Sequence, residues 1–552
     1  LIIYTKYYFF INYNLINFIM SSILLILLFQ LVFINCQNIQ SIIINGLLVT
    51  GKEGLEPYLG HILIGKNGKI LNVLRETGSE LNEIKEKYKD VEIIDAKDKI
   101  VIPGGVDTGV KFDFSEGIHD IESSDNFFTG SVAAVCGGTT TILDIIEPNL
   151  NERETDSEAL KSKLDEAEHN SVTDYSFHMV INNFENDILS KEKFIKKAIY
   201  KNGINSFRFD TYTQKPKLSR EEMVEIFKLL KKYGGLAVVD CGDENLMKEI
   251  FSKYTEEEKS NPKFYSKVYS PDVERDSIEE IIKIAKEVGF IQGIHISHIS
   301  SESSMYLIRE EKKSGFIATT EVTPHHLILT EDVYDNKNGI DYLTSPPLRT
   351  KNDVEKLWKG LNEGIIDYVV SDHCPFTKDQ KRGKRTKPDF RLFYNQDLSI
   401  NKTYDTTSEK WSSKKSPEIN EIPKGFGGIE TRMILMYHYG VVEKRINLPK
   451  FVQVTSTNAA KRFGLYPRKG VLERGSDADI VIIDPNEQTK LKAEKLHMNT
   501  NFCPFEDLTI NGKIKTVFSR GTKMVDNYQL LSNALIHKGN VLRRLRYFLG
   551  GM

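Results

Sequence analysis

The sequence Val101-Ile-Pro-Gly-Gly-Val-Asp-Thr-Gly-Val-Lys111 decides the fold of this chain. An apolar strand runs into Pro103-Gly104-Gly105, residue types that mark a turn. Short strand-like segments precede this stretch over residues 40–100, and alternating strands and helices follow it. The stretch therefore carries the chain from a β-rich region into a long α/β region.

Predicted strands alternate with amphipathic helices over residues 101–466. The strands are expected at Thr139–Ile145, Ile204–Phe209, Leu236–Val239, Gly293–His298, Ile317–Val322 and Ile365–Ser371. A helix over 219–233 opens with the capping box Ser-Arg-Glu-Glu222, and Ser277-Ile-Glu-Glu280 is predicted to open another. Repeated strand–helix units favour an α/β fold with a TIM-like (β/α)8 barrel rather than two Rossmann halves.

The β-rich sequence returns after the barrel. Residues 38–100 contain a hairpin signal at Asn67-Gly68, and residues 467–526 again read as strands. Two such blocks on either side of one α/β region predict a small β-sandwich domain built from both ends of the chain. A tail over 527–552 follows it and contains Arg543-Arg-Leu-Arg546, which we expect on the surface or at a subunit contact.

Residues 1–37 have the character of a leader. We expect 1–19 to be upstream sequence and Met20 to be the start of a signal peptide over 20–37, with an apolar run over 23–34. That length suits a signal peptide and is short for a membrane span. The expected location is therefore the secretory lumen or the outside of the cell. The alternatives are a membrane anchor formed by an uncleaved leader, or the cytoplasm if the start lies elsewhere.

Composition excludes several kinds of partner. The 552 residues are 40% hydrophobic and 27% charged, with a formal net charge of −3. This balance gives no case for nucleic acid, and no stable membrane insertion is expected once the leader is removed. Five cysteines in this length do not form a disulfide framework. We expect Cys136, Cys241, Cys374 and Cys503 to be buried thiols, with a bridge as the alternative.

Residues 378–420 interrupt the barrel pattern with a basic run and then a Ser/Thr/Asn/Lys-rich segment. We interpret this polar insertion as a solvated surface loop, with a partner-docking loop as the alternative. It contains one glycosylation sequon, Asn401-Lys-Thr403.

Further motifs, in order along the chain, carry a resemblance to a known family. They are Gly137–Asp144, Gly203–Arg208, His295–Ser301, Thr344–Arg349, Ser371–Phe376, Gly427–Met433, Thr455–Ala460 and Gly475–Asp479. With the opening stretch they resemble the cyclic amidohydrolases: dihydropyrimidinases, hydantoinases and the non-catalytic collapsin response mediator proteins fit best. Glu321-Val-Thr-Pro-His-His326 has dihydroorotase or allantoinase character, so the subfamily stays open. The resemblance spans about residues 40–526 and implies a homotetramer.

The resemblance also implies two zinc ions bridged by a hydroxide and held by six side chains. The matching positions are Gly109, Lys111, Arg208, Asp240, His298 and Asp372. Only His298 and Asp372, the family's general base, keep the expected residue types. A guanidinium stays protonated and cannot form the carbamate that the family's lysine makes at the Arg208 position. We therefore expect no cofactor, or at most one divalent metal, for which Asp240 could be an additional ligand.

Three positions correspond to the family's substrate contacts. Ser345 is kept, and Lys424 replaces an asparagine. The family's tyrosine, which steadies the developing oxyanion, falls at Thr213, with Tyr212 one place early. A slip of one residue sends a strand side chain to the opposite face unless a loop absorbs it.

The substitutions leave two cations, Lys111 and Arg208, and two carboxylates, Asp240 and Asp372, where the metals would lie. Buried charges persist when they are paired. We therefore predict that these four side chains form ion pairs. The alternative is a solvated barrel mouth in which they point outward.

The histidines allow two interpretations. We expect His298 to be a hydrogen-bonded core histidine, and His373 and the pair His325-His326 to hold loops. A mononuclear metal site formed by His298 with Glu321, Asp372 and Asp240 is the alternative.

These observations together predict a secreted or lumenal dihydropyrimidinase-like pseudoenzyme that acts as a binding or assembly module. One alternative is an active hydrolase of the ring C–N bond of dihydropyrimidines or hydantoins with a single metal. Another is a protein that binds a small cyclic amide without turnover.

Overall fold

The computed structural model describes residues 38–78, 84, 86–116, 119, 121–148, 155–181, 188–212, 218–291, 293–316, 318–388, 404–412 and 417–544. The predicted leader, the sequon and Thr213 lie outside these residues. Among the helices that the structure describes, none combines the length and the apolar character needed to cross a membrane.

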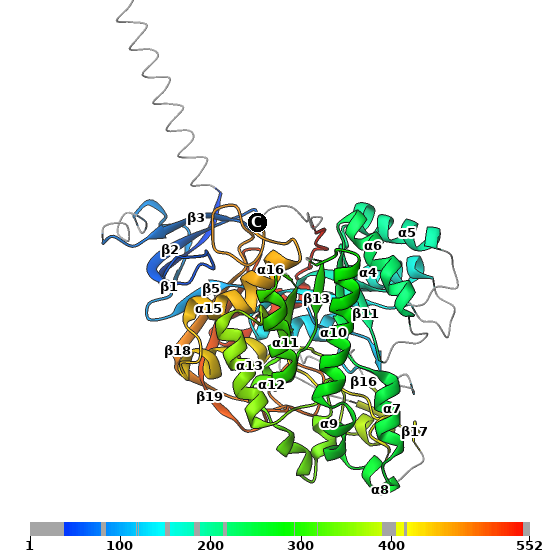
Figure 1. Cartoon of the computed structure of the whole chain (residues 1–552). Coiled ribbons are helices and arrows are strands. Elements are labelled where there is room, and N and C mark those ends of the chain that lie inside the picture. Colours follow the sequence, from blue (N-terminus) through cyan, green and yellow to red (C-terminus); the bar gives the residue numbers. More distant parts are fainter. Residues whose placement is uncertain are drawn as a thin grey trace, which may run out of the picture.

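A parallel eight-stranded sheet forms the centre of the molecule, with the order β15-β14-β13-β12-β11-β10-β9-β6 (Figure 1). The strands are β6 (Gly105–Asp107), β9 (Thr139–Ile146), β10 (Asp174–Val180), β11 (Ser206–Asp210), β12 (Leu236–Asp240), β13 (Ile294–Ile296), β14 (Thr319–Val322) and β15 (Tyr368–Val369). Beyond the two edge strands, Val110 pairs with His373. The opening stretch thus brings the first and last strands together, and the predicted (β/α)8 barrel is confirmed.

Strand β10 is the barrel strand that the sequence analysis missed. Its polar residues Asp174, Ser176 and His178 alternate with apolar ones, yet all seven positions are buried. The polar set faces buried partners: His178 contacts Ser206 and the Thr108 carbonyl oxygen. Alternating polar and apolar residues usually indicate a strand with one face in solvent. The pattern of β10 therefore did not predict a barrel strand that is buried on both faces.

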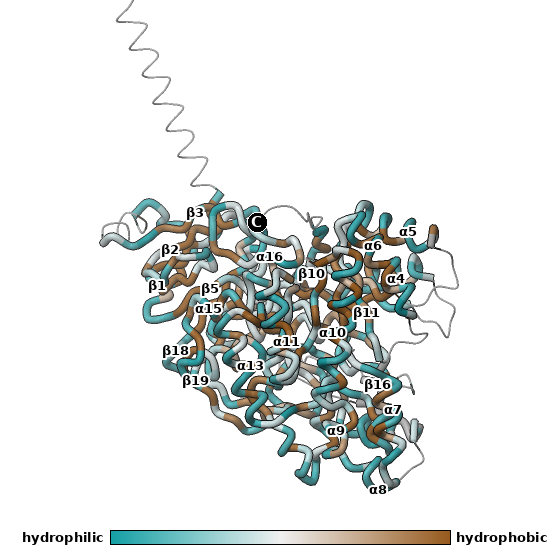
Figure 2. The backbone as a smooth tube through the Cα atoms, viewed as in Figure 1, coloured by the Kyte–Doolittle hydropathy of each residue, from teal (hydrophilic) through white to brown (hydrophobic). Residues whose placement is uncertain are grey.

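Helices surround the barrel (Figure 1). They include α3 (Phe127–Cys136), α4 (Asp156–Asn170), α5 (Ile188–Lys197), α6 (Arg220–Tyr233), α10 (Pro271–Glu287), α11 (Glu302–Lys313) and α13 (Lys351–Glu363). Ser219 and Glu222 form the predicted capping box of α6. The predicted start at Ser277 is wrong, because Ser270 caps α10 with Pro271 in the first helical position. Apolar segments gather along the strands and inner helices, and polar ones on loops and outer helices (Figure 2).

A second sheet is built from both ends of the chain, as predicted. Its strand order is β21-β20-β19-β18-β5-β1-β2-β3, with β4 paired to β1. The strands are β1 (Ile39–Leu48), β2 (Tyr58–Gly65), β3 (Ile70–Arg75), β4 (Glu92–Asp95), β5 (Ile100–Pro103), β18 (Ile480–Lys490), β19 (Thr509–Ser519), β20 (Thr522–Asp526) and β21 (Gln529–Leu530). The predicted hairpin turns at Gly68, whose φ of 74° is of the kind that glycine favours.

The division between the two domains lies slightly later than predicted. Ile100–Pro103 pairs with β1 and β18 in the large sheet, and the barrel begins with β6. Gly104 joins the two strands, where a Cβ atom would come within 2.1 Å of Thr140 Oγ1. The close approach of Thr140 thus requires a glycine at this junction.

The polar insertion contains a pair of strands, and the tail contains a buried arginine; neither was predicted. Within the insertion, β16 (Lys384–Pro388) and β17 (Tyr404–Lys410) form an antiparallel pair. In the tail, Arg544 is only 4% exposed, and its guanidinium donates to Ser206 Oγ at 2.8 Å and to the Phe177 carbonyl oxygen. The expected surface position is therefore wrong for Arg544, because the backbone amides of Leu542 and Arg544 bond to Tyr175 in β10 and to Gly203 just before β11.

Candidate active site

The predicted site residues converge at the carboxyl-terminal ends of the barrel strands, where barrel enzymes place their active sites. Arg208 lies within β11 and Asp240 ends β12. His298 follows β13, and Asp372 follows β15. These four residues are 3–7% exposed. They meet because parallel strands direct their carboxyl ends to one rim.

The four charged side chains form two ion pairs, as predicted. The Arg208 guanidinium contacts the Asp240 carboxylate directly. Lys111 Nζ lies 3.2 Å from Asp372 Oδ1. Although burial raises the pKa of Asp240, the positive charges of Arg208, His298 and Lys111 outweigh it and lower this pKa to about 2. Both cations therefore have a carboxylate partner in the space where the resemblance implies metal ions.

His298 lies between two carboxylates that contact opposite sides of its ring. Glu321 Oε1 lies 3.1 Å from Nδ1, and Asp372 Oδ1 lies 3.4 Å from Nε2. The two ring nitrogens point in divergent directions. One ion on either nitrogen would therefore meet only one of the two carboxylates. A metal site that includes all of His298, Glu321 and Asp372 would therefore require side chains to move.

Glu321 is one of the ligands in the mononuclear alternative. Its surroundings in the structure favour the protonated, neutral form of the carboxyl. Its carboxyl is 3% exposed and lies 3.0 Å from His295 Nε2. Burial, with added repulsion from Asp240 and Asp372, raises its pKa to about 8.

Replacing Glu321 by glutamine is expected to remove part of the pH dependence of stability. The folded-state pKa of about 8 exceeds the ordinary value of 4.5. The raised pKa therefore stabilises the folded state fully below pH 4.5. This contribution to the free energy of unfolding falls by about 1.4 kcal/mol per pH unit as the pH rises from 4.5 to 8, where it is lost. Urea unfolding at about pH 5.5 and 7.5 should show a steeper loss for the wild type than for Glu321→Gln. Equal slopes would contradict the assignment, and the exposed Glu310→Gln serves as the control.

Two of the three substrate-contact positions lie together. Tyr212 Oη lies 2.8 Å from Ser345 Oγ, and Tyr265 Oη donates to the same hydroxyl at 3.2 Å. Tyr212 lies two residues beyond the end of β11, in a loop and not on the strand. Lys424 Nζ donates to the Asn420 carbonyl oxygen and lies 5.6 Å from the centre of the Tyr265 ring. It therefore lies at the edge of this group.

Two of the three histidines expected to hold loops, His373 and His326, bond to loop residues, whereas Nε2 of His325 is buried without a hydrogen bond. His373 Nε2 lies 3.1 Å from Asp125 Oδ2, and its Nδ1 accepts from the Gly428 amide. His326 bridges Thr323 Oγ1 and the Pro346 carbonyl oxygen. These contacts satisfy both ring nitrogens of His373 and of His326.

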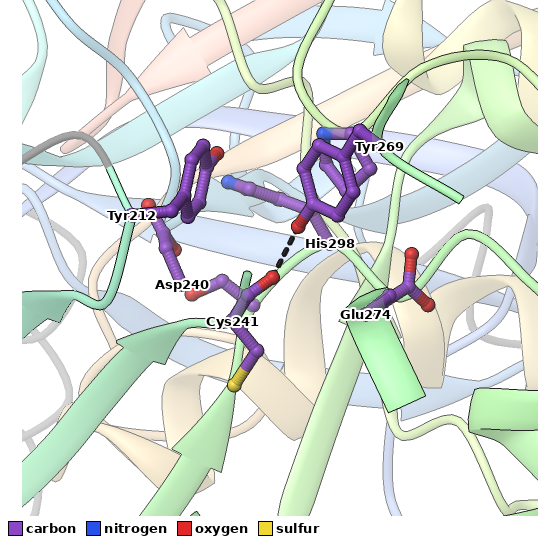
Figure 3. A pocket seen from close by; sticks show the side chains of 8 residues that line it. Tyr212, Asp240, Cys241, Tyr269, Glu274 and His298 are labelled. Atoms are coloured by element: carbon purple, nitrogen blue, oxygen red, sulfur yellow. Dashed lines mark hydrogen bonds between the residues drawn. The ribbon is translucent and has the colours of Figure 1, made fainter. Parts of the chain in front are cut away.

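A small cavity opens beside the ion pairs (Figure 3). It is lined by Tyr212, Asp240, Cys241, Tyr269, Glu274, Ser297, His298 and Pro346. The Tyr269 hydroxyl donates to the Cys241 carbonyl oxygen across one side of it. Its volume of about 10 Å³ holds about one water molecule. Sites for small organic ligands enclose about 300–1,000 Å³, so a substrate ring would require side chains to move.

These residues do not fit a binuclear metal centre. Asp240 Oδ1, Asp372 Oδ1 and both His298 ring nitrogens are buried without a hydrogen bond, which leaves donor atoms for a cation. However, the Arg208 guanidinium and the Lys111 ammonium contact the same two carboxylates. At Gly109, a Cβ atom would lie 3.2 Å from Val370 Cγ2, so the space of a ligand side chain is partly closed.

Comparisons with known proteins agree with this architecture. A model of the amidohydrolase family matches residues 100–524. A D-phenylhydantoinase of Escherichia coli O1:K1 is 31% identical over 474 residues, which cover 86% of this chain and 93% of the relative.

Solved structures show the same similarity. The dihydropyrimidinase from Brevibacillus agri NCHU1002 aligns with a TM-score of 0.78 and 27% identity, over 92% of this chain and all of that one. The D-hydantoinase from a Bacillus sp. AR9 aligns with a TM-score of 0.77 and 28% identity over the same shares. The resemblance inferred from the motifs is confirmed over most of the chain.

Proposed function

This chain belongs to the amidohydrolase family, within its dihydropyrimidinase and hydantoinase group, and we propose that it no longer hydrolyses cyclic amides through a binuclear zinc centre. It acts instead as a binding or assembly module. The observation that carries this proposal is the pairing of Arg208 with Asp240 and of Lys111 with Asp372. A permanent guanidinium beside the metal positions repels a divalent ion and offers no ligand atom.

The ligand of such a module would be a small cyclic amide. Supporting this, Tyr212, Tyr265 and Ser345 present hydroxyl groups to one another beside the cavity. Hydroxyls can donate to a carbonyl oxygen and accept from an amide N–H. We further propose that the protein is secreted or lumenal and assembles as a homotetramer, proposals that rest on the leader and on the family resemblance.

A second candidate function is hydrolysis of the ring C–N bond of a cyclic amide with one metal ion. The names of the relatives favour this candidate, since they are called hydantoinases and dihydropyrimidinases. The ion pairs of Arg208 with Asp240 and of Lys111 with Asp372 support the first. In the second candidate Asp372 would be the general base and would bind the metal together with His298.

Turnover separates the two candidates. The purified protein, incubated with zinc and a panel of dihydropyrimidines and hydantoins, is expected to show no ring opening above a no-protein control. Metal-dependent turnover that disappears in Asp372→Ala would overturn the proposal. Isothermal titration with the same compounds would detect binding without turnover, and Tyr212→Phe should weaken that binding about fivefold to tenfold, the equivalent of one hydrogen bond.

A further inference from the structure

A cluster of three metal-ligating side chains lies outside the candidate active site. Cys136 is the last residue of α3, Glu430 precedes α14 (Arg432–Leu435), and His497 lies between β18 and β19. One donor atom of each residue lies within 4.8 Å of the donor atoms of the other two. Among the residues that the structure describes, this is the group of at least three His, Cys, Asp or Glu side chains that meets this spacing.

The local contacts already order the cluster. His497 Nδ1 lies 2.7 Å from Glu430 Oε1, and the His497 backbone amide donates to Glu430 Oε2 at 2.5 Å. Glu430 therefore fixes both the backbone and the ring of His497. When a metal binds, Glu430 Oε1 would exchange its contact with Nδ1 for the ion, while Oε2 keeps its bond to the backbone amide. The cluster thus has a built geometry rather than a chance proximity of flexible side chains.

We propose that Cys136, Glu430 and His497 form a binding site for one Zn²⁺ ion. Thiolate sulfur, imidazole nitrogen and carboxylate oxygen are the ligands that zinc takes in proteins. Tetrahedral zinc sites place donor atoms ~3.5 Å apart, so a closure of about an ångström would complete the site.

Exposure allows the ion to enter. The His497 side chain is 20% exposed and that of Glu430 is 8% exposed, and Cys136 is half-buried. Three protein ligands leave a fourth position for water. Binding releases the thiol proton, so affinity falls as the pH is lowered.

The site would join parts of the fold that are distant in sequence. Helix α3 packs against β9 of the barrel and against β19 of the large sheet. His497 belongs to the segment that leads into β19, and Glu430 belongs to the end of the barrel. A zinc ion held by the three residues would therefore crosslink the two domains, and would stabilise the folded chain because it binds that state alone.

The full-length protein, stripped with a chelator and titrated with zinc or cobalt, tests this inference. We expect one zinc per chain, a thiolate-to-metal charge-transfer absorption with Co²⁺, and a rise of several degrees in melting temperature on zinc addition. All three should be lost in Cys136→Ser and weakened at least tenfold in Glu430→Gln. They should be kept in Cys503→Ser, a matched thiol control, and in His298→Ala/Asp372→Ala.

Three outcomes would overturn the inference: no zinc bound by the wild type, zinc retained unchanged in Cys136→Ser, or no charge-transfer band with cobalt. Metal lost in His298→Ala/Asp372→Ala but kept in Cys136→Ser would instead place the ion at the barrel mouth. That outcome would contradict the proposed function as well. If Cys136, Glu430 and His497 bind no zinc and the barrel mouth binds none either, the proposed function still stands. The two proposals can therefore be refuted independently.

Discussion

Asp240→Asn is expected to lower the free energy of unfolding by about 3–5 kcal/mol at neutral pH, the usual cost of removing one partner of a buried ion pair. The cost arises because the Arg208 guanidinium stays charged and is only 6% exposed. Asparagine keeps the size of the side chain, so the change reports mainly on charge. Urea unfolding of the wild type and the variant measures the difference.

Two controls make this result specific. The double variant Arg208→Met/Asp240→Leu removes both charges and should be at least as stable as the wild type, because hydrophobic replacements of buried pairs are often neutral or stabilising. Glu280→Gln breaks a surface pair with Arg220, in which both side chains are 45% exposed, and should cost less than about 1 kcal/mol. An effect of Asp240→Asn no larger than that of Glu280→Gln would refute the buried pair.

Restoring the family's ligand types should restore zinc at the barrel mouth. In a Cys136→Ser background, which removes the second cluster, the variant Gly109→His/Lys111→His/Arg208→Lys/Asp240→His is expected to gain tightly bound zinc. The variant exchanges two fixed cations for groups that can be neutral or carboxylated ligands. At position 109 a Cβ atom would lie 3.2 Å from Val370 Cγ2, so Val370 must give way by a few tenths of an ångström at the first atom of the new side chain.

The same variant without Arg208→Lys is the matched control. It supplies all the restored histidines but keeps the guanidinium, so it should bind at most one zinc ion weakly. Elemental analysis after dialysis gives the stoichiometry of each protein. Equal zinc in the four-substitution variant and its Cys136→Ser parent would show that the substitutions do not explain the loss of the metal centre.

Much of the fold and part of the site followed from the sequence. Pro103-Gly-Gly105 marks the passage from the large sheet to the barrel, although the chain passes there from β5 to β6 through Gly104 alone and not through a turn. That Lys111, Arg208, Asp240 and Asp372 form ion pairs followed from the resemblance and from charge, since buried ions need partners, but which cation meets which carboxylate did not. The order of the motifs predicts that Arg208 lies on one barrel strand and Asp240 at the end of the next.

Other features could not be read from the chain. Cys136, Glu430 and His497 are separated by hundreds of residues in total, and only packing of α3 beneath the large sheet brings them together. Arg544 appeared as one charge in a basic tail, and its burial depends on acceptors at Ser206 and Phe177. Local patterns report local structure, whereas these contacts are set by tertiary packing.

The zinc content of the Cys136→Ser protein tests the central claim most directly, because that background leaves the barrel mouth as the remaining candidate site. After saturation with zinc and dialysis, elemental analysis should find no tightly bound zinc. One or two zinc ions per chain that disappear on adding Asp372→Ala would contradict the account and show a working metal centre among these residues.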